Sequence, residues 1–364
     1  MERAEKAKQW LSKSVYPLWR KQGVDSTNGS FVECLSENGE PQHVPQRAMV
    51  QARQIYAFNE ASKLQILERE FVEKTIRRAI DFFVERYSAP SGGFVHSIDE
   101  AGQPANRQLD LYTQAFALFG LANAYEVLAD ENLKKRALQL IQYLRAERKV
   151  AKGGFSEIIV GQTPFQSNPH MHLFEAAIAW MRIDRDPTWK ELASSILDLC
   201  QSKFAGNEAG VVAEQFDAEW SPCLEGGRFY WEPGHQCEWA WLILEFENAG
   251  GAPARELANR IFSASEKCGV SAGRLIDEVW SDGKAKKSSS RFWPQSERIK
   301  AAVALGEGPV ADEAFDALFK FFEGMKPGLW EDQILEDGKF KKQAVKASSL
   351  YHIINALSEY INKR

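Results

Sequence analysis

An apolar, helix-forming segment with a polar start recurs along this chain about every 60 residues, and this repeat limits the possible folds more than any other feature. The segments begin near residues 47, 110, 168, 235, 294 and 350. Each is followed by a second helical segment, so the repeating unit is helix, loop, helix. Six helical hairpins whose alternate helices run in the same direction close most naturally into a ring. We therefore expect an all-α fold in which residues 1–364 form a single domain.

Helical periodicity predicts about twelve helices. Three of the starts are marked by proline, which fits the first turn of a helix: Pro169, Pro233 and Pro294. Asn168 precedes the first of these and is a good N-cap residue. The predicted ranges are 2–20, 46–65, 66–87, 109–129, 131–148, 168–184, 186–203, 235–249, 252–268, 293–306, 310–325 and 348–362.

The longer connections precede the alternate helices and carry recurrent turn chemistry. Gly-Gly followed by an aromatic residue occurs at 91–94 (SGGF) and at 152–155 (KGGF), and a related EGGRF at 225–229. This pattern predicts short β-hairpins at one mouth of the ring. The segment 281–291 (SDGKAKKSSSR) is the most loop-like part of the chain, and we expect a solvated or mobile loop there.

Four of the six histidines lie at the starts of the alternate helices: His170, His172, His235 and His352. The other two, His43 and His96, lie in connections. His172 with Glu175, and His235 with Glu238, have the spacing of three that places both side chains on one helix face. Helix starts gathered at one mouth also favour an oxygen-rich or anionic ligand. Three helices that each bring a histidine to one layer predict a functional layer.

Composition excludes several classes of protein. The net charge of −5 and pI near 5.8 argue against a general nucleic-acid or anionic-membrane partner. No apolar run approaches the roughly 20 residues of a membrane span, and the charged N-terminus lacks the apolar core of a signal peptide. The five cysteines are odd in number and lack CxxC spacing, which is typical of reduced thiols. We expect a cytoplasmic protein, either a monomer or a homodimer.

The residues of the predicted layer favour acid–base chemistry by histidine. Two H-x-x-E pairs could hold a metal, but di-iron bundles use the reverse order, E-x-x-H, with further glutamates. Cys237 points away from His235, no G-x-S-x-G elbow is present, and neither a P-loop nor a dinucleotide fingerprint occurs. We therefore expect no metal and no cofactor. Histidines titrate near neutral pH and move protons, and a carboxylate one turn away fixes their tautomer.

Six motifs, taken together, resemble the N-acylglucosamine 2-epimerase superfamily of sugar epimerases and isomerases. They occur in the order of that family between residues 50 and 353: VQARQIYAF, LYTQAFALFGLANAY, NPHMHLFEA, PGHQCEWAWL, WPQSERIKA and LYHI. The resemblance implies an (α/α)6 barrel and an enzyme that interconverts reducing sugars at C1 and C2 through an enediol. The motifs NPHMHLFEA and PGHQCEWAW are most similar to those of D-mannose isomerases.

The resemblance also implies a role for each motif residue. His352 would be the base for the C2 proton, and His235, oriented by Glu238, would assist ring opening or act on the opposite face. Arg53 would offset the enediolate charge. His172 would be a further catalytic residue that binds a hydroxyl and joins in proton transfer. The remaining implied binding residues, of which the tryptophans are candidate stacking surfaces, are Tyr112, Asn168, Glu175, Trp231, Trp293, Gln295 and Trp330. His170 would support His172 from behind.

The implied reaction is the interconversion of D-mannose and D-fructose, with a sugar 2-epimerase as the alternative. Two other classes remain open. A glycoside hydrolase on the same barrel would use carboxylates such as Asp110, Glu214 or Glu232, and a non-catalytic sugar binder would use none. The sequence leaves open whether the sugar is phosphorylated; the arginines that could meet a phosphate are Arg47, Arg228, Arg291 and Arg298.

Overall fold

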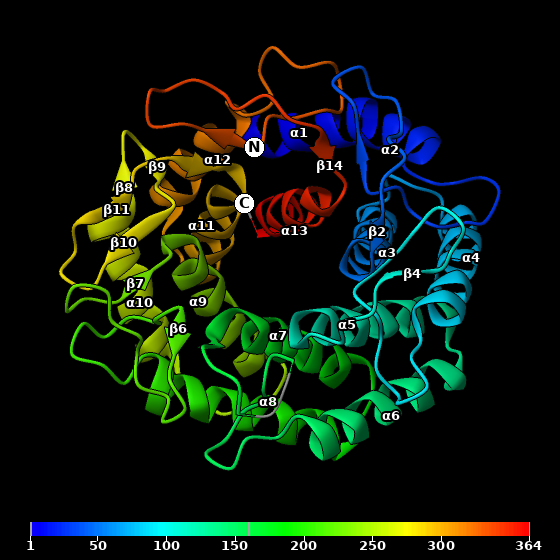
Figure 1. Ribbon diagram of the computed structural model, residues 1–364. Helices are drawn as coiled ribbons and strands as arrows, with labels where there is room; N and C mark the ends of the chain where they lie inside the picture. The colour runs from blue at the N-terminus through cyan, green and yellow to red at the C-terminus, as the bar shows by residue number, and fades with distance from the viewer. Residues whose placement is uncertain (1, 159–160, 364) are drawn as a thin grey trace.

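The helices form two concentric rings around one axis (Figure 1). The computed structural model describes residues 2–158 and 161–363. Six parallel helices make the inner ring, and each contacts the next, with α13 closing onto α3. The inner helices are α3 (Ala48–Lys63), α5 (Leu111–Leu128), α7 (Ser167–Ile183), α9 (Pro233–Asn248), α11 (Phe292–Leu305) and α13 (Ser348–Lys363). The predicted all-α (α/α)6 barrel is therefore confirmed.

The outer helices run antiparallel to the inner ones. They are α4 (Arg69–Tyr87), α6 (Glu131–Glu147), α8 (Pro187–Leu199), which continues into a π-helical turn η2 (Cys200–Phe204), α10 (Arg255–Gly269) and α12 (Gly308–Phe319). The N-terminal segment fills the sixth outer position with α1 (Glu2–Trp10), the π-helical turn η1 (Leu11–Val15) and α2 (Tyr16–Gln22). Arg3 of α1 forms ion pairs with Asp312 and Asp316 of α12, and α1 packs on α13. The first and last helices thus complete the ring.

Burial explains why these segments differ in sequence. The inner helix α5 is apolar around most of its circumference because both the outer ring and the neighbouring inner helices cover it. The outer helix α10 has one apolar face, with buried Leu257, Ile261 and Phe262, and a solvated opposite face. Gly120 of α5 lies against Ala52 of α3, and a Cβ there would come within 2.8 Å of the alanine Cβ. A small residue is therefore required where these two inner helices meet.

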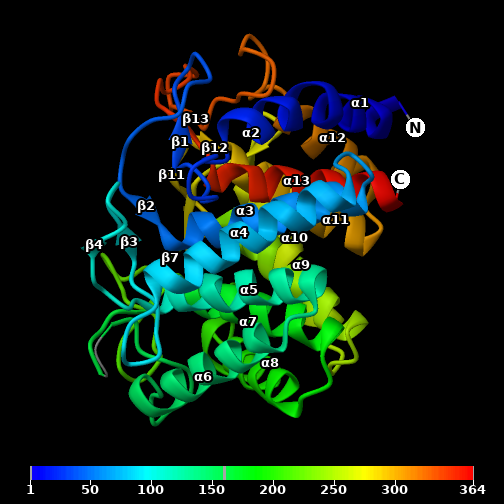
Figure 2. The same ribbon diagram turned by 90° about the vertical axis from the view of Figure 1, so that its right-hand side faces the viewer.

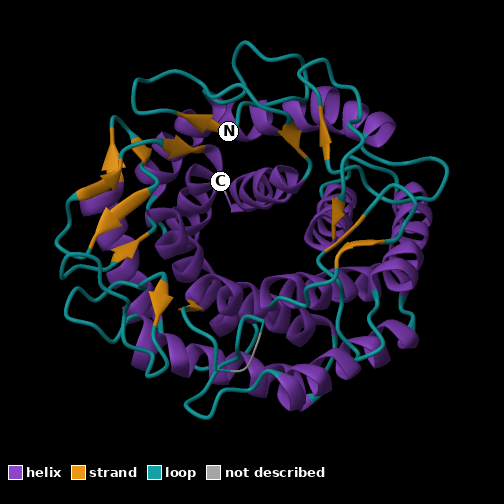
Figure 3. Ribbon diagram, viewed as in Figure 1, coloured by secondary structure: helices purple, strands orange, loops and turns teal. Residues whose placement is uncertain are grey.

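Short antiparallel strands line one end of the barrel, the end at which the inner helices begin (Figures 2 and 3). Five of them lead directly into inner helices. The strands are β1 (Cys34–Leu35), β2 (Gln46–Arg47), β3 (Ser97–Ile98), β4 (Pro104–Asn106), β5 (Phe165–Gln166), β6 (Gln215–Phe216), β7 (Tyr230–Trp231), β8 (Val270–Ser271), β9 (Arg274–Leu275), β10 (Glu278–Trp280), β11 (Ala285–Lys287), β12 (Ser290–Arg291), β13 (Gln333–Ile334) and β14 (Val345–Lys346).

These strands join the connections of successive repeats. β2 pairs with β3, β5 with β6, β7 with β10, and β12 with β13. β1 and β14 then link the two ends of the chain, with Cys34 opposite Lys346. Among the described residues, strand pairs therefore join the rim at five of the six junctions between successive connections, all except the one between the connections before α5 and α7.

A recurrent side-chain clamp holds the rim to the inner helices. The fourth residue of four inner helices is a buried glutamine whose amide both accepts from a backbone N–H and donates to the carbonyl of the same rim residue. The pairs are Gln51 with Phe31, Gln114 with Phe94, Gln236 with Val212 and Gln295 with Leu275, at 2.7–3.0 Å. In α7 the fourth residue is His170, whose Nε2 accepts from the Phe155 N–H at 3.0 Å. We call these five contacts the rim clamps.

The twelve predicted helices match the observed ones in order and nearly in length, with α1, η1 and α2 together in place of the single helix predicted at 2–20. The hairpins at the Gly-Gly sequences are also present, because Phe94 bridges Ser88 and Phe155 bridges Lys149 across tight turns. Two expectations were wrong. The helix predicted at 310–325 stops at Phe319. The segment 281–291 contains β11 and part of a paired sheet, held by ion pairs of Lys286 and Lys287 with Glu278, so it is not a free loop.

Candidate active site

Side chains from all six inner helices meet in one layer just inside the strand-covered mouth. Five of them occupy the sixth position of their helices, and the last occupies the fifth position of α13. They are Arg53, Phe116, His172, Glu238, Glu297 and His352. The equal spacing in six parallel helices brings them to the same height. We call this set the histidine layer.

His352 is held by Glu297 of the neighbouring helix α11. Its Nδ1 lies 2.8 Å from Glu297 Oε1, in a buried contact. Burial lowers the pKa of His352 well below its usual value, and the positive charges of Arg53 and Lys300 lower it further. A neutral imidazole that donates from Nδ1 leaves the Nε2 lone pair free. His352 thus has the protonation state and tautomer of a general base.

His235 has the opposite character. Its Nδ1 lies 2.9 Å from Glu214 Oε2 and 3.9 Å from Glu232 Oε2. Burial disfavours the imidazolium, but the two carboxylates outweigh burial and raise the pKa of His235 to about 9. His235 is therefore protonated at neutral pH and is suited to act as an acid.

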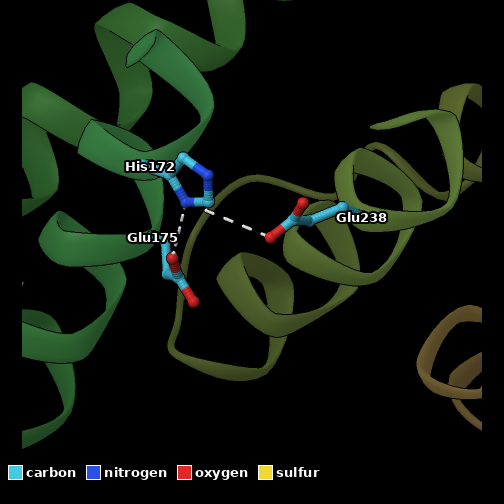
Figure 4. Close-up of side chains that lie close together, drawn as sticks. All are labelled: His172, Glu175 and Glu238. Carbon is cyan, nitrogen blue, oxygen red and sulfur yellow. Dashed lines mark hydrogen bonds and ion pairs between the residues drawn. The ribbon is translucent and has the colours of Figure 1, made fainter. Parts of the chain in front are cut away.

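The predicted orientation of His235 by Glu238 was wrong. His235 is the third residue of α9 and lies nearer the rim than Glu238, and its Nδ1 bonds to Glu214, which precedes strand β6. Glu238, three residues further along, instead faces the barrel interior and lies 4.0 Å from His172 Nδ1 (Figure 4). The spacing of three between His235 and Glu238 did not bring these two side chains into contact, because the Glu214 carboxylate at the rim binds His235 instead.

His172 forms a pair with Glu175 on its own helix. Nδ1 lies 3.0 Å from Glu175 Oε2 (Figure 4). The other carboxylate oxygen accepts from the Tyr351 hydroxyl. Burial lowers the pKa of His172 to about 4. Burial alone would raise the pKa of Glu175, but the hydrogen bond from His172, the charge of Lys300 and the hydrogen bond from Tyr351 lower it. His172 is therefore a second neutral imidazole with a free Nε2.

Arg53 brings a positive charge to the layer without a carboxylate of its own. Its NH2 group donates to the Tyr112 hydroxyl at 2.9 Å, and its guanidinium lies 4.3 Å from the Phe116 ring centroid and 4.9 Å from that of Tyr351. Among residues 2–158 and 161–363, no partner accepts from its Nε. Arg53 can therefore donate to a bound oxygen and stabilise negative charge that develops there.

Trp293 lies between the two histidines of opposite protonation state. Its ring centroid is 5.0 Å from that of His235 and 5.6 Å from that of His352. Tyr112 packs edge-on against His172, with centroids 5.2 Å apart. Asn168, one turn before His172, has a buried Oδ1 that no described donor satisfies. The structure thus brings Tyr112 and Trp293 beside the histidines, with Asn168 on the same helix as His172.

Three predicted binding residues have other roles. Gln295 is a rim clamp, with both ends of its amide committed to the Leu275 backbone. Trp330 is 1% exposed and stacks on Trp19 at 5.1 Å, between the N-terminal segment and the last connection. Trp231 is 2% exposed, and its indole N–H donates to the Trp280 carbonyl. All three stabilise the fold, so their assignment to the sugar site is corrected.

Several residues of the site were not assigned from the sequence. Glu297 and Lys300 belong to the SERIK segment, where spacing of three was a usable signal, and Tyr351 directly precedes His352. No pattern in the sequence indicated that Glu214 is the partner of His235. Glu214 lies 21 residues before His235 and reaches this histidine only because the rim strands pair.

Three groups of side chains have a donor composition that could hold a metal ion. They are His172 with Glu175 and Glu238, Glu214 with Glu232 and His235, and Glu238 with Glu297 and His352. The first and third share Glu238 and already lie beside a resident cation, because the Lys300 ammonium is 2.6 Å from Glu297. The Glu297 carboxylate of this layer is thus paired with a protein cation.

Taken together, the histidine layer and the nearby His235 combine a neutral base, a protonated acid and a guanidinium with no carboxylate bound to it among the described residues. This combination can remove a proton next to a carbonyl, protonate an oxygen and stabilise the enediolate in between.

No helix in the described ranges is long and apolar enough to cross a membrane.

Comparisons with known proteins agree with this chemistry. The sequence pattern of the N-acylglucosamine 2-epimerase (GlcNAc 2-epimerase) family matches residues 29–356. The chain is 36% identical to a mannose-6-phosphate isomerase of Rhizobium meliloti (strain 1021) over 372 residues, which cover 96% of this chain and 94% of that protein.

Two solved structures have the same fold. A cellobiose 2-epimerase from Bacillus thermoamylovorans B4167 superposes with a TM-score of 0.88 at 18% identity, covering 99% of each chain. A D-mannose isomerase superposes with a TM-score of 0.82 at 18% identity, covering 99% of this chain and 97% of the other. The chain belongs to the N-acylglucosamine 2-epimerase family and is an enzyme of its sugar isomerase and epimerase class.

Proposed function

We propose that this enzyme interconverts D-mannose and D-fructose by proton transfer through an enediolate. The observation that carries the proposal is that His352 and His235 both lie against Trp293, one with a single carboxylate partner and the other with two nearby carboxylates, which favours opposite protonation of the two imidazoles. One reaction that needs both is aldose–ketose isomerisation, in which an acid assists ring opening and a base then moves a carbon-bound proton.

Each residue has a distinct step. Protonated His235 donates to the ring oxygen as the pyranose opens, and its imidazole then recovers the proton that the anomeric hydroxyl releases, which leaves the open-chain aldose. His352 Nε2 then removes the proton from C2, and Arg53 with Tyr112 stabilises the negative oxygen of the enediolate. The same imidazole returns the proton to C1 while a proton moves from O2 to O1, which gives the ketose. Glu297 holds His352 in the productive tautomer throughout.

Local charge supports an unphosphorylated sugar. The arginines considered for phosphate binding are engaged by carboxylates: Arg47 by Glu33, Arg228 by Asp282, Arg291 by Asp277 and Glu232, and Arg298 by Glu266 and Glu313. A phosphate would have to compete with these ion pairs. The name of the Rhizobium meliloti relative, a mannose-6-phosphate isomerase, supports a mannose-type sugar. The experiment below tests whether the sugar carries a phosphate.

A 2-epimerase is the second candidate, and one observation favours it. His172 is a second neutral imidazole, brought by α7, whereas His352 comes from α13. An epimerase needs a second base to return the proton to the opposite face of C2, and His172 could supply it. By contrast, the carboxylates considered for a hydrolase are partners of histidines: Glu214 and Glu232 surround His235, and Asp110 binds His96 at 2.9 Å.

The test is NMR of the purified protein in D2O with separate samples of D-mannose, mannose 6-phosphate, N-acetylmannosamine and cellobiose. We expect fructose from mannose, and we expect His352→Ala to lower kcat by about 10²- to 10⁴-fold, the usual contribution of a general base. His43→Ala is the control, because this histidine is exposed at the rim. Epimeric aldoses without a ketose would establish the epimerase instead. Turnover of mannose 6-phosphate in preference to mannose would overturn the choice of a neutral sugar.

A further inference from the structure

Lys300 is a fully buried lysine at the centre of the barrel. It is the ninth residue of α11, one turn beyond Glu297, and its exposed fraction is 0%. Its Nζ lies 2.6 Å from Glu297 Oε2 and 3.8 Å from the centroid of the Trp241 ring. A lysine ammonium is almost never fully buried unless it is paired. Its position beneath the histidine layer therefore calls for an explanation.

Five inner helices bring charged or titratable groups to this ammonium and its partner. Two cations face three carboxyl groups, two histidines and one tyrosine. They are Arg53 from α3, His172 and Glu175 from α7, Glu238 from α9, Glu297 and Lys300 from α11, and Tyr351 and His352 from α13. Lys300 contacts Glu297 directly, and Glu238 and Glu175 act on it from further away.

Glu297 divides its two oxygens between Lys300 and His352. Oε2 faces the ammonium, and Oε1 accepts from His352 Nδ1. Burial holds the pKa of Glu297 above its usual value, and Lys300 is the first group that opposes this increase. Removal of the positive charge would therefore favour uptake of a proton by the carboxyl group, because an unpaired buried carboxylate is costly.

A protonated Glu297 would reverse the hydrogen bond to His352. A carboxylic acid donates, so it would pair with an unprotonated Nδ1 and move the imidazole proton to Nε2. Nε2 is the atom that must be free to take the C2 proton in the proposed isomerisation. The charge of Lys300, although it does not reach the sugar-binding side, thus decides which nitrogen of His352 is basic.

We propose that Lys300 is a positioning residue that keeps Glu297 ionised and so holds the His352 proton on Nδ1. The inference depends on the proposed function only for its effect on turnover. The arrangement of ammonium, carboxylate and imidazole exists without substrate, so it can be tested without substrate.

The first experiment is 15N NMR of the histidines in the substrate-free enzyme. In the wild-type enzyme, His352 should carry its proton on Nδ1 from pH 5 to 8. In Lys300→Met, the proton should move to Nε2 at pH 7 and return to Nδ1 at higher pH, as Glu297 ionises. His352→Gln identifies the resonances. A wild-type His352 with its proton on Nε2 would overturn the proposal without the need for any variant, as would an unchanged tautomer in Lys300→Met.

The second experiment follows kcat against pH with the sugar that the enzyme turns over. Lys300→Met should lower kcat at pH 7 by about 10²-fold and recover activity as the pH rises, whereas Lys300→Arg should keep the wild-type profile. Lys63→Met is the matched control, because Lys63 pairs with Glu60 and Glu126 near the other end of the inner helices; its profile should not change. A loss in Lys300→Met that is the same at every pH would indicate a packing role and contradict the inference.

The two experiments separate this proposal from the proposed function. If no sugar is converted but the tautomer of His352 depends on Lys300, the positioning role is retained and the isomerase assignment fails. If mannose is converted and the tautomer of His352 is independent of Lys300, the isomerase assignment is retained and the positioning role of Lys300 fails.

Discussion

His235, the third residue of α9, and Glu214, in the connection that leads into α9, are joined by a 2.9 Å hydrogen bond at the mouth. Glu214 also accepts from the backbone N–H of Glu232, at the start of the helix that carries His235. The charge of the proposed acid is therefore set by the rim, whereas the base His352 is set by the neighbouring inner helix. The two catalytic groups can be perturbed independently.

The first prediction concerns the pH dependence of activity. Because the pKa of His235 is raised to about 9, the acid is protonated below that value, and kcat/KM should fall as pH rises through 9. Glu214→Gln removes the largest favourable charge and should move this limb to lower pH. The folding stability that arises from this interaction should be fully present below about pH 6.5 and be lost as pH rises through about 9. The exposed Glu208→Gln is the control, and an unmoved limb in Glu214→Gln would reject the assignment.

The second prediction concerns Arg53. Arg53→Met should lower kcat by about 10²- to 10³-fold with a smaller change in KM, as for the loss of one preorganised donor to a developing oxyanion. Arg53→Lys should restore little, because a lysine cannot reproduce the planar donor set held between Tyr112, Phe116 and Tyr351. Steady-state kinetics would measure both. An increase in KM alone would assign Arg53 to ground-state binding instead.

The third prediction concerns His170. Its pKa is lowered to about 4 by burial, so the folded state excludes a proton that the unfolded chain binds below about pH 6.5. Stability should be lost as pH falls from 6.5 towards 4, by up to about 3 kcal/mol. His170→Gln introduces the side chain that four other inner helices use as a rim clamp, so it should fold and lose less stability in acid. Urea unfolding at pH 5 and pH 7 would test this, and equal acid sensitivity in the two proteins would contradict it.

The fourth prediction separates two tryptophans. Trp330→Ala should lower the free energy of unfolding by about 3–5 kcal/mol, since it empties a core position against Trp19, and should leave kcat nearly unchanged. Trp293→Ala should reduce kcat/KM, because this ring lies between His235 and His352. Thermal unfolding and kinetics of the two variants form a matched pair. A specific loss of sugar turnover in Trp330→Ala would restore it to the site.

The sequence predicted the ring because its signals are local. Helical periodicity, prolines at helix starts and Gly-Gly turns each depend on neighbouring residues, so they predict the single helices and hairpins. The nearly equal spacing of the six repeats then predicts how these hairpins close into the barrel. The layer that holds His172 and His352 follows from the same regularity, since their positions within parallel helices set their height.

What could not be predicted were the partners that reach across the fold. Glu238 had the right spacing to orient His235, but competition from Glu214 decided the contact. Gln295 resembled a binding residue because it lies at the start of a functional helix. Its role became clear only when Leu275, 20 residues away, was seen to occupy both ends of its amide. Long-range pairing of polar groups depends on how the connections fold over the mouth, and a single sequence contains no measure of that.

The rim clamps separate the hairpin tips from the proton-transfer centre, so the sequences of these two parts could evolve at different rates. Each clamp fastens one hairpin to the helix beneath it through a side chain that lies one turn or less from the histidine layer, and it does not use the neighbouring repeat. The tip of a hairpin could therefore lengthen, shorten or change its polarity while the helix start stays in register. On such a scaffold the specificity of the mouth could diverge one hairpin at a time, with the same proton-transfer centre retained beneath it.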